Sequence, residues 1–262
     1  MRKILVVMLI LLIGKCHAQQ NMFTLAGAID YALKNNVSIR AADFEVASRR
    51  ELRKTSFDLP KTEASLLYGQ YNSYVKHDNN FTVTQSIPFS TFGSQGKLNR
   101  SLVASSELQK MQTANELVFQ IKQTYNRLLY IYSLRKLLHQ QDSIFEGFYK
   151  SASLRYKAGE TRLLEQSTAE AQRTQAKIRL RENESDIAVL RSQLRNLLNT
   201  HETPDIEDHG LSEIYSTANL DTTFLSANPS LAYALQQIEV SRNERKVQSA
   251  RFAPDFLVGF FS

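Results

Sequence analysis

The feature that most constrains this chain is a proline-free stretch from Thr91 to Ala158. Within it, apolar residues recur at helical spacing, at Leu117, Ile121, Tyr125, Leu128 and Tyr132. That spacing places them on one face of an α-helix. If the helix runs from Ser94 to Lys157, its about 64 residues would be roughly 95 Å long. Such a helix exceeds the core of a compact domain, so it must pack along other helices of similar length.

A second arm continues the pattern after a short turn. Its apolar residues lie between Gln, Arg and Glu, as in coiled coils; they are Leu163, Leu164, Ile178, Ile187, Leu190, Leu194, Leu197 and Leu198. Between the arms, only Gly159 is suited to a sharp reversal. Residues 93–199 are therefore predicted to form a long antiparallel helical hairpin with its tip at Gly159. Gly147, inside the first arm, indicates a bend or a close helix approach.

The first residues have the pattern of a secretory signal peptide. Arg2 and Lys3 precede an apolar run from Ile4 to Ile13, and residues 16–18 form a small-residue cleavage site, so residues 1–18 are predicted to be removed. The only cysteine would leave with them, which excludes disulfides and thiol chemistry in the mature chain. Three basic residues leave too, and the formal net charge falls to 6 − 3 = +3. That charge is too small and too evenly spread to indicate nucleic-acid binding.

Residues 19–60 are predicted to form two helices. Thr24 is a suitable N-cap for the first, Leu25 to Asn35, and the second is expected from Val37 to Asp58, ending before Pro60. The composition, 42% hydrophobic and 22% charged, excludes a chain that is disordered by composition and a polytopic helical membrane protein.

From Lys61 the hydrophobic period changes from 3.6 to two, which predicts a β-hairpin within residues 61–92. Its two strands are expected to be about ten residues long. Their alternation is carried by Ala64, Leu66, Tyr68, Phe81, Val83, Ile87 and Phe89, and further aromatic residues near the ends are Tyr71, Tyr74 and Phe92. Alternating polarity with terminal aromatic residues is typical of a transmembrane β-barrel hairpin. A soluble hairpin has the same alternation, but here it would have little to pack on.

The last part of the chain repeats its beginning. Residues 200–226 are a polar connector, and residues 227–262 start a second copy, a helix followed by the beginning of a strand. Asn228 to Leu231 resembles Asn36 to Ile39, and Pro254 echoes Pro60. The offset indicates an internal repeat of about 193 residues whose second copy is incomplete.

In this order, the segments resemble the TolC-like outer membrane efflux proteins over essentially the whole mature chain. The resemblance is carried by TLAGAIDYALKNN (24–36), VTQSIPF (83–89), LRYKAGETRLLE (154–165) and ANPSLAYALQQIEVSRNE (227–244). The wording of KTSFDLPKTEASLLYGQYNS and NNFTVTQSIPF is most similar to members paired with heavy-metal efflux pumps of the resistance-nodulation-division class.

The resemblance implies a mainly α fold, in which a long helical hairpin of the α-barrel type is joined to a β-hairpin of a trimeric outer-membrane β-barrel. It implies a homotrimer in the outer membrane that extends into the periplasm. The trimer would be a passive export conduit without cofactors, served by a periplasmic adaptor and an inner-membrane pump. By the same resemblance Tyr156, Gly159, Thr161, Leu163 and Leu164 lie at a periplasmic tip, where the adaptor docks and the pore closes.

The sequence departs from that family in holding one repeat and only the start of the second. It supplies two strands and part of a third, which cannot close a barrel in lipid. We therefore expect a fragment or an incomplete gene product, and the function is that of the full-length parent. The exported substrate is not encoded here, because in this architecture the pump selects it.

No catalytic motif occurs in the sequence, so an enzyme is not expected. The only cluster of possible metal ligands is His201, Glu202, Asp205, Glu207, Asp208 and His209, and its spacing matches no helical or hairpin ligand geometry, so a solvated connector and no metal site are expected. Two alternatives stay open, a periplasmic coiled-coil adaptor and a structural protein without channel activity. Insertion of the hairpin from Ala64 to Phe89 into lipid would exclude the structural alternative.

Overall fold

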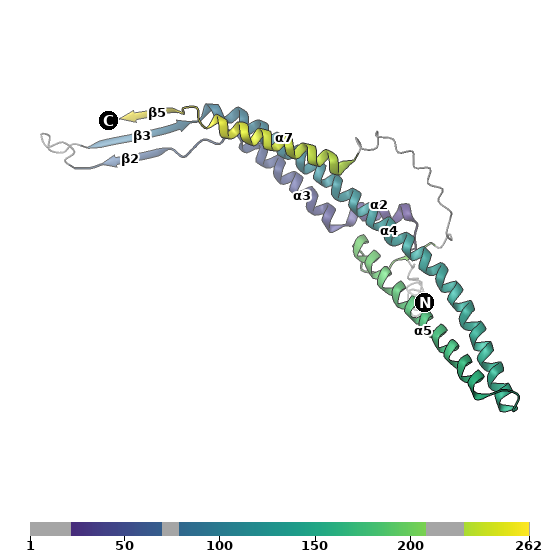
Figure 1. Ribbon diagram of the computed structural model, residues 1–262. Coiled ribbons are helices and arrows are strands. Elements are labelled where there is room, and N and C mark those ends of the chain that lie inside the picture. The colour runs from purple at the N-terminus through teal and green to yellow at the C-terminus, as the bar shows by residue number, and fades with distance from the viewer. Residues whose placement is uncertain (1–21, 70–78, 208–227, 262) are drawn as a thin grey trace, which may run out of the picture. The chain divides into compact units, whose positions relative to one another are not determined.

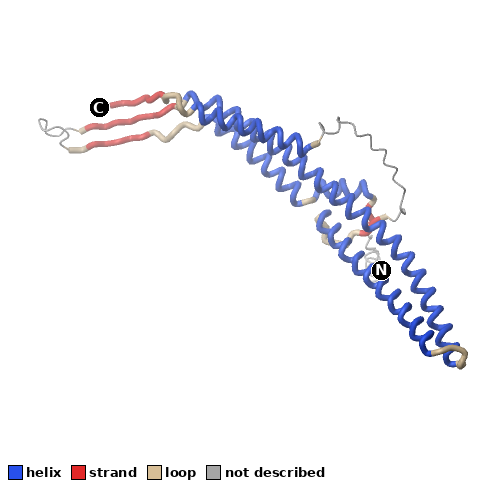
Figure 2. The backbone as a smooth tube through the Cα atoms, viewed as in Figure 1, coloured by secondary structure: helices blue, strands red, loops and turns tan. Residues whose placement is uncertain are grey.

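The computed structural model describes residues 22–69, 79–207 and 228–261 (Figure 1). In chain order the elements are β1 (Met22–Phe23), α2 (Leu25–Asn35), α3 (Val37–Leu52), the 3-10 helix η1 (Arg53–Phe57), β2 (Glu63–Leu67), β3 (Asn80–Ile87), α4 (Phe89–Lys157), α5 (Leu163–Leu198), β4 (Asp205–Ile206), α7 (Pro229–Ala250) and β5 (Phe256–Phe261). Helices predominate and the strands are short (Figure 2). The prediction of a mainly α fold is confirmed. The predicted signal peptide, Tyr71, Tyr74 and residues 208–226 of the connector lie outside the described residues.

The chain divides into two compact units. The first, called the hairpin unit, comprises the described parts of Met1–Asn36 and Leu117–Ser216. The second, called the sheet unit, comprises those of Val37–Glu116 and Thr217–Ser262. Helix α4 contributes to both. Each unit therefore combines segments that are far apart in the sequence.

In the hairpin unit, α4 and α5 run antiparallel and pack along a buried seam. The helical face predicted from the sequence is buried, with Ile121 and Leu128 fully covered on α4, and Leu194 and Leu198 fully covered on α5. The Asn183 side chain donates a hydrogen bond to the Ile131 carbonyl across the seam, at 3.3 Å. The predicted helical hairpin is thereby confirmed. Among the described helices, none is both long and apolar enough to span a bilayer.

Of the two alternatives predicted for Gly147, a bend or a close helix approach, the described residues contradict the close approach. Gly147 lies within the continuous helix α4, and a Cβ atom built on it would meet nothing within 4 Å. The glycine therefore leaves open space beside the helix.

Helix α2 has the bounds predicted from the sequence, and asparagines join its end to the end of α5. Thr24 caps its start, since its hydroxyl accepts a hydrogen bond from the Gly27 amide at 3.0 Å. At the other end, the Asn36 side chain donates to the Leu197 carbonyl at 2.8 Å. Reciprocally, the Asn199 side chain donates to the Asn35 carbonyl at 3.0 Å. Each asparagine thus satisfies a terminal carbonyl of the other helix.

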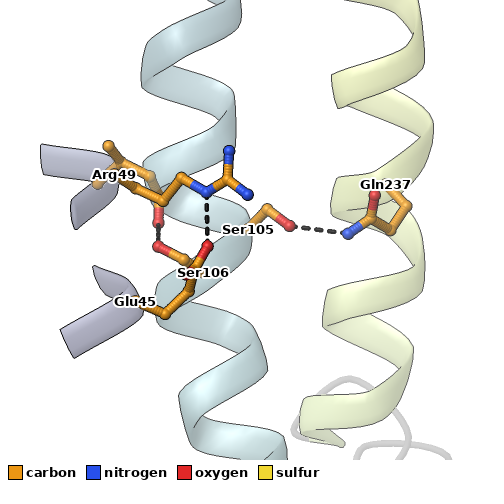
Figure 3. A network of polar contacts seen from close by, with 6 residues as sticks. Glu45, Arg49, Ser105, Ser106 and Gln237 are labelled. Atoms are coloured by element: carbon orange, nitrogen blue, oxygen red, sulfur yellow. Dashed lines mark hydrogen bonds and ion pairs between the residues drawn. The ribbon is translucent and has the colours of Figure 1, made fainter. Parts of the chain in front are cut away.

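In the sheet unit, α3 and α7 both pack antiparallel to α4 (Figure 1). Lys110 of α4 forms an ion pair with Asp43 of α3 at 2.5 Å. On the other side, the Gln237 side chain of α7 donates to the Ser105 hydroxyl of α4 at 2.8 Å (Figure 3). The buried apolar residues of the flanking helices are Ile39 and Val46 on α3, and Val240 and Val247 on α7. Figure 3 also shows the ion pair between Arg49 and Glu45, one turn apart on α3.

Two helix boundaries differ from the predictions. The helix expected to reach Asp58 ends at Leu52 and continues as η1, where the Thr55 and Ser56 hydroxyls donate to carbonyls three residues earlier. Such bonds compete with the α-helical ladder. Helix α4 begins at Phe89 rather than Ser94, directly after Pro88, so Phe89 and Phe92 are helical and not part of a strand. Proline is well tolerated at a helix start because its missing N–H has no partner there.

Strands β2, β3 and β5 form an antiparallel sheet in the order β2-β3-β5. Strand β3 has eight residues, close to the predicted length of about ten, whereas β2 has five, so the predicted length is wrong for β2. Gly69, at φ 127°, follows β2 in a conformation outside the strand region. Strand β5 forms where the sequence predicted a strand to begin, and it pairs with β3 from Ile87↔Phe256 to Thr82↔Phe261.

Candidate functional site

The turn between α4 and α5 closes on Gly159, which adopts a left-handed conformation with φ 75°. The Gly159 amide donates to the Tyr156 carbonyl at 3.0 Å, and the Glu160 amide donates to the Arg155 carbonyl at 2.9 Å. These two bonds form a Schellman motif, which satisfies the last carbonyls of α4. A left-handed residue is required at this position of the motif, and glycine adopts that conformation without the steric cost of a Cβ atom.

The residues predicted to form the tip lie together around this turn. Leu163 and Leu164 open α5 with 58% and 74% of their surfaces exposed, and Tyr156 is 39% exposed in the last turn of α4. The Thr161 hydroxyl donates to the Glu165 carboxylate across the first turn of α5. That carboxylate also lies at the positive end of the helix dipole. The tip thus combines a firmly capped turn with exposed leucines.

Sequence reasoning missed one member of the tip, Leu154. Its side chain is 67% exposed in the last turn of α4. The signal that could have found it is its position five residues before Gly159, on the same exposed end as Leu163 and Leu164. An ion pair between Arg155 and Glu160, 3.8 Å apart and mostly exposed, is the polar complement of these leucines.

Three turns back from the tip, Glu146 joins the two arms. Its carboxylate accepts a hydrogen bond from Arg173 of α5 and lies 3.3 Å from the Lys177 ammonium. Burial alone would raise the pKa of Glu146, but the hydrogen bonds from Arg173 and Lys177 outweigh it, so its pKa is lowered. The arms are therefore held in register by a carboxylate that stays charged at neutral pH.

A second candidate site is the sheet of the sheet unit, whose register sorts its side chains onto two faces. The apolar face carries Ala64, Leu66, Phe81, Val83, Gln85, Ile87, Phe256, Val258 and Phe260. The opposite face, called the polar face, carries Glu63, Ser65, Leu67, Asn80, Thr82, Thr84, Ser86, Leu257, Gly259 and Phe261. On β2 and β3, apolar and polar side chains are almost completely separated between the two faces. Gln85 is the polar exception, and its amide bonds the Pro60 carbonyl and the Thr62 hydroxyl at the helical end of the sheet.

Within the part of the chain that the structure describes, the apolar face is uncovered. Leu66, Phe256, Val258 and Phe260 each expose more than 60% of their surface. Contiguous exposed apolar surface of this kind marks a site that contacts lipid or another protein.

Comparison with known proteins gives one kind of match. No protein-family model matches the chain, and no curated protein matches it by sequence. Among solved structures, CusC matches with a TM-score of 0.71 and 16% identity, over 91% of this chain and 60% of CusC. CmeC, the outer membrane channel of Campylobacter jejuni, matches with a TM-score of 0.74 and 16% identity, over 91% of this chain and 56% of CmeC. VceC, an outer membrane protein of Vibrio cholerae, matches with a TM-score of 0.69 and 18% identity, over 90% of this chain and 61% of VceC.

The fold is that of the TolC-like outer-membrane channels. The chain spans about 60% of the length of these channels. At 15 to 18% identity the likeness concerns the fold, and the TolC-like fold is what the resemblance seen in the sequence implied.

In this TolC-like fold, the connector contains a small site that the sequence did not predict. Strand β4 pairs in parallel with β1, Met22 opposite Asp205 and Phe23 opposite Ile206. The Tyr125 hydroxyl, on α4, lies 3.1 Å from the Phe23 carbonyl and 3.3 Å from the Glu207 carbonyl. Two turns further, the Tyr132 hydroxyl donates to the Asp205 carboxylate at 2.7 Å.

Asp205 is thereby engaged as a structural anchor. Its second carboxylate oxygen accepts a hydrogen bond from Arg191 of α5, so Asp205 connects the connector to both arms. Burial and the hydrogen bond to Asp205 raise the pKa of Tyr132 to about 12. Of the other residues considered as metal ligands, Asp208 and His209 lie outside the described residues. Within the part of the chain that the structure describes, no three such residues gather in a metal-binding group.

Proposed function

We propose that the chain is part of a subunit of an outer-membrane efflux channel, a passive conduit without enzymatic activity. The observation that carries the proposal is the sheet, because one face is apolar and exposed while the other is rich in small polar side chains. A barrel strand in a membrane needs this arrangement, with alternate side chains toward lipid and toward a water-filled interior. The TolC-like fold supports the same conclusion, since CmeC and CusC are described as channels.

In this proposal the apolar face contacts outer-membrane lipid, and Thr82, Thr84 and Ser86 face the conduit. The helices extend into the periplasm as the wall of a tunnel. A homotrimer supplies the remaining wall, because the outer edges of β2 and β5 are unpaired in the described sheet and a strand edge in lipid needs a partner strand.

The tip is proposed to dock a periplasmic adaptor that couples the channel to an inner-membrane pump of the resistance-nodulation-division class. Leu154, Leu163 and Leu164 offer an apolar surface on a turn that the Schellman motif holds in one conformation, and such rigid exposed turns are suited to recognition. Heavy-metal export is the proposed use, because the sequences of residues 54–73 and 79–89 are similar to those of family members paired with heavy-metal efflux pumps. The pump would select the substrate.

The sheet also favours this function over its alternatives. A structural coiled-coil protein has no use for a sheet with one exposed apolar face. A periplasmic adaptor would leave that face in water, where contiguous apolar surface promotes association.

A pair of neighbouring labels tests the membrane assignment. In the full-length protein, with its native cysteines replaced by serine, a fluorophore is attached to the cysteine of Val83→Cys in one variant and of Thr84→Cys in another. After reconstitution into vesicles, lipids carrying a nitroxide quencher on the acyl chain should quench the label at Val83 strongly and the label at Thr84 weakly. Equal quenching at both positions, or none at either, would contradict the proposal.

The docking role of the tip is tested separately. Leu163→Ser with Leu164→Ser, placed in the full-length protein in its natural host, should lower metal tolerance while membrane insertion stays unchanged. Ile178→Ser, on the same helix and 45% exposed, is the matched control and should leave tolerance unchanged. Normal tolerance in the double variant would remove the tip from the proposal.

A further inference from the structure

A polar pocket lies in the sheet unit where η1, α4 and α7 come together next to the strands. Its volume is about 280 Å³. The residues that decide its chemistry are Thr55, Asp58, Thr91, Phe92 and Arg251. They come from three segments that the fold brings together from distant parts of the sequence. The pocket lies far from the tip in sequence and takes no part in the proposed docking.

The pocket presents one charge of each sign. Asp58 makes no hydrogen bond or ion pair with any residue in the described ranges. Arg251 makes one side-chain contact there, a 3.3 Å hydrogen bond to Gln248 of its own helix. A ligand with a cationic and an anionic group would match both, since each charge is free to pair.

The hydroxyl groups favour a cationic donor beside Asp58. The Thr55 hydroxyl donates its proton to the Leu52 carbonyl at 2.7 Å, and the Thr91 hydroxyl donates to the Pro88 carbonyl at 3.0 Å. With their protons engaged, these oxygens can only accept further hydrogen bonds. A primary ammonium group has three N–H donors and suits such a set, whereas a quaternary ammonium has none.

Aromatic side chains connect the pocket to the apolar face of the sheet. Phe57 and Phe252, next in sequence to Asp58 and Arg251, expose 77% and 92% of their surfaces. The Phe57 ring lies 4.9 Å from the ring of Phe92, and the Phe89 ring lies 5.5 Å from that of Phe256 on the apolar face. Exposed aromatic rings at the end of a lipid-facing sheet are typical of the membrane interface.

We propose that this pocket binds the headgroup of an ethanolamine phospholipid. Arg251 pairs with the phosphate, Asp58 and the two threonine oxygens accept hydrogen bonds from the ammonium, and the acyl chains run along Phe57, Phe252 and the apolar face. The proposal rests on the membrane function proposed above, because that function places the end of the sheet at the headgroup level. It adds a preference for one headgroup, which a barrel surface alone does not require.

The test compares three lipids that share the same acyl chains, namely phosphatidylethanolamine, phosphatidylcholine and phosphatidylglycerol. The full chain is solubilised in detergent, each lipid is titrated, and the fraction of protein that carries a bound lipid is measured by native mass spectrometry. We expect phosphatidylethanolamine to bind about tenfold more tightly than phosphatidylcholine, because the quaternary ammonium of phosphatidylcholine cannot form the charge-assisted hydrogen bonds. Arg251→Gln should weaken its binding by a similar factor. Asp58→Asn should shift the preference toward phosphatidylglycerol, because the repulsive carboxylate is gone.

Arg242→Gln is the matched control, since Arg242 lies on α7 and, within the described residues, its ion pair is with Glu239 of the same helix, at 3.4 Å. It should bind phosphatidylethanolamine like the unchanged chain, and circular dichroism should show equal helix content in all variants. Flotation with vesicles is measured in parallel. A chain that floats but binds the three lipids equally retains the membrane function and overturns the headgroup site. A chain that floats with none of them overturns both, and an unchanged preference in Arg251→Gln and Asp58→Asn also overturns the site.

Discussion

Replacing Gly159 by alanine isolates the energetic cost of the backbone conformation at the tip. A Cβ atom at this position would meet none of the described residues within 4 Å, so the substitution introduces no clash with them. The φ angle of 75° remains, and a non-glycine residue pays about 1–2 kcal/mol to adopt it. Gly159→Asn should lose less, because asparagine visits the left-handed region more readily than alanine.

Gly147→Ala is the matched control, with the opposite sign. Gly147 is equally unobstructed but helical, so alanine there should stabilise the chain by about 0.5–1 kcal/mol through the lower entropy of its unfolded state. For a chain of this size, 1 kcal/mol corresponds to a shift in Tm of about 2–4 °C. Thermal unfolding of the full chain in detergent is followed by circular dichroism at the helix band. The Tm should fall for Gly159→Ala and rise for Gly147→Ala. Equal shifts for the two alanine variants, or a loss in Gly159→Asn as large as in Gly159→Ala, would refute the reasoning.

Two further predictions concern the connector and the sheet. The pKa of Tyr132 is raised to about 12. The protonated Tyr132 therefore stabilises the folded chain fully below about pH 10, and this stabilisation is lost as the pH rises through 12. The free energy of unfolding should fall by about 2–3 kcal/mol over that range. Urea unfolding between pH 8 and 12 should show this loss, and Tyr132→Phe should be less stable at pH 8 with a flatter profile; parallel profiles would contradict the assignment. In the sheet, a Cβ atom at Gly259 would lie 3.1 Å from the Phe261 ring and from the Thr84 methyl group. Gly259→Val should therefore cost about 1–3 kcal/mol and speed amide exchange in β5, and unchanged exchange would show that the ring moves aside freely.

Local signals in the sequence were sufficient for much of the fold. Thr24 and the adjacent residues Asn35 and Asn36 set the bounds of α2, because N-capping and helix termination by polar residues act within one turn. The buried face of α4 followed from its spacing alone. The tip could be located from Gly159, since no other residue in the turn suits a left-handed conformation.

The rest depended on contacts that no local pattern carries. Strand β4 has two residues, too few for a period, and it exists because it pairs with β1 near the other end of the chain. Asp205 therefore looked like a possible metal ligand, although Tyr132 and Arg191 already occupy its oxygens. The pocket between Asp58 and Arg251 was hidden for the same reason, because its walls come from segments nearly a full repeat apart.

The asparagine pair that joins α2 to α5 also bears on how the chain folds. The Asn36 bond to Leu197 spans 161 residues, and the Asn199 bond to Asn35 spans 164. Because synthesis proceeds at about 5–20 residues per second, Leu197 of α5 is synthesised roughly 8–32 s after Asn36 at the end of α2. The contacts between α4 and α5 span fewer residues, 52 for the bond from Asn183 to Ile131, so this hairpin can close first. The N-terminal helix is therefore expected to dock last, and its arrival marks completion of the unit.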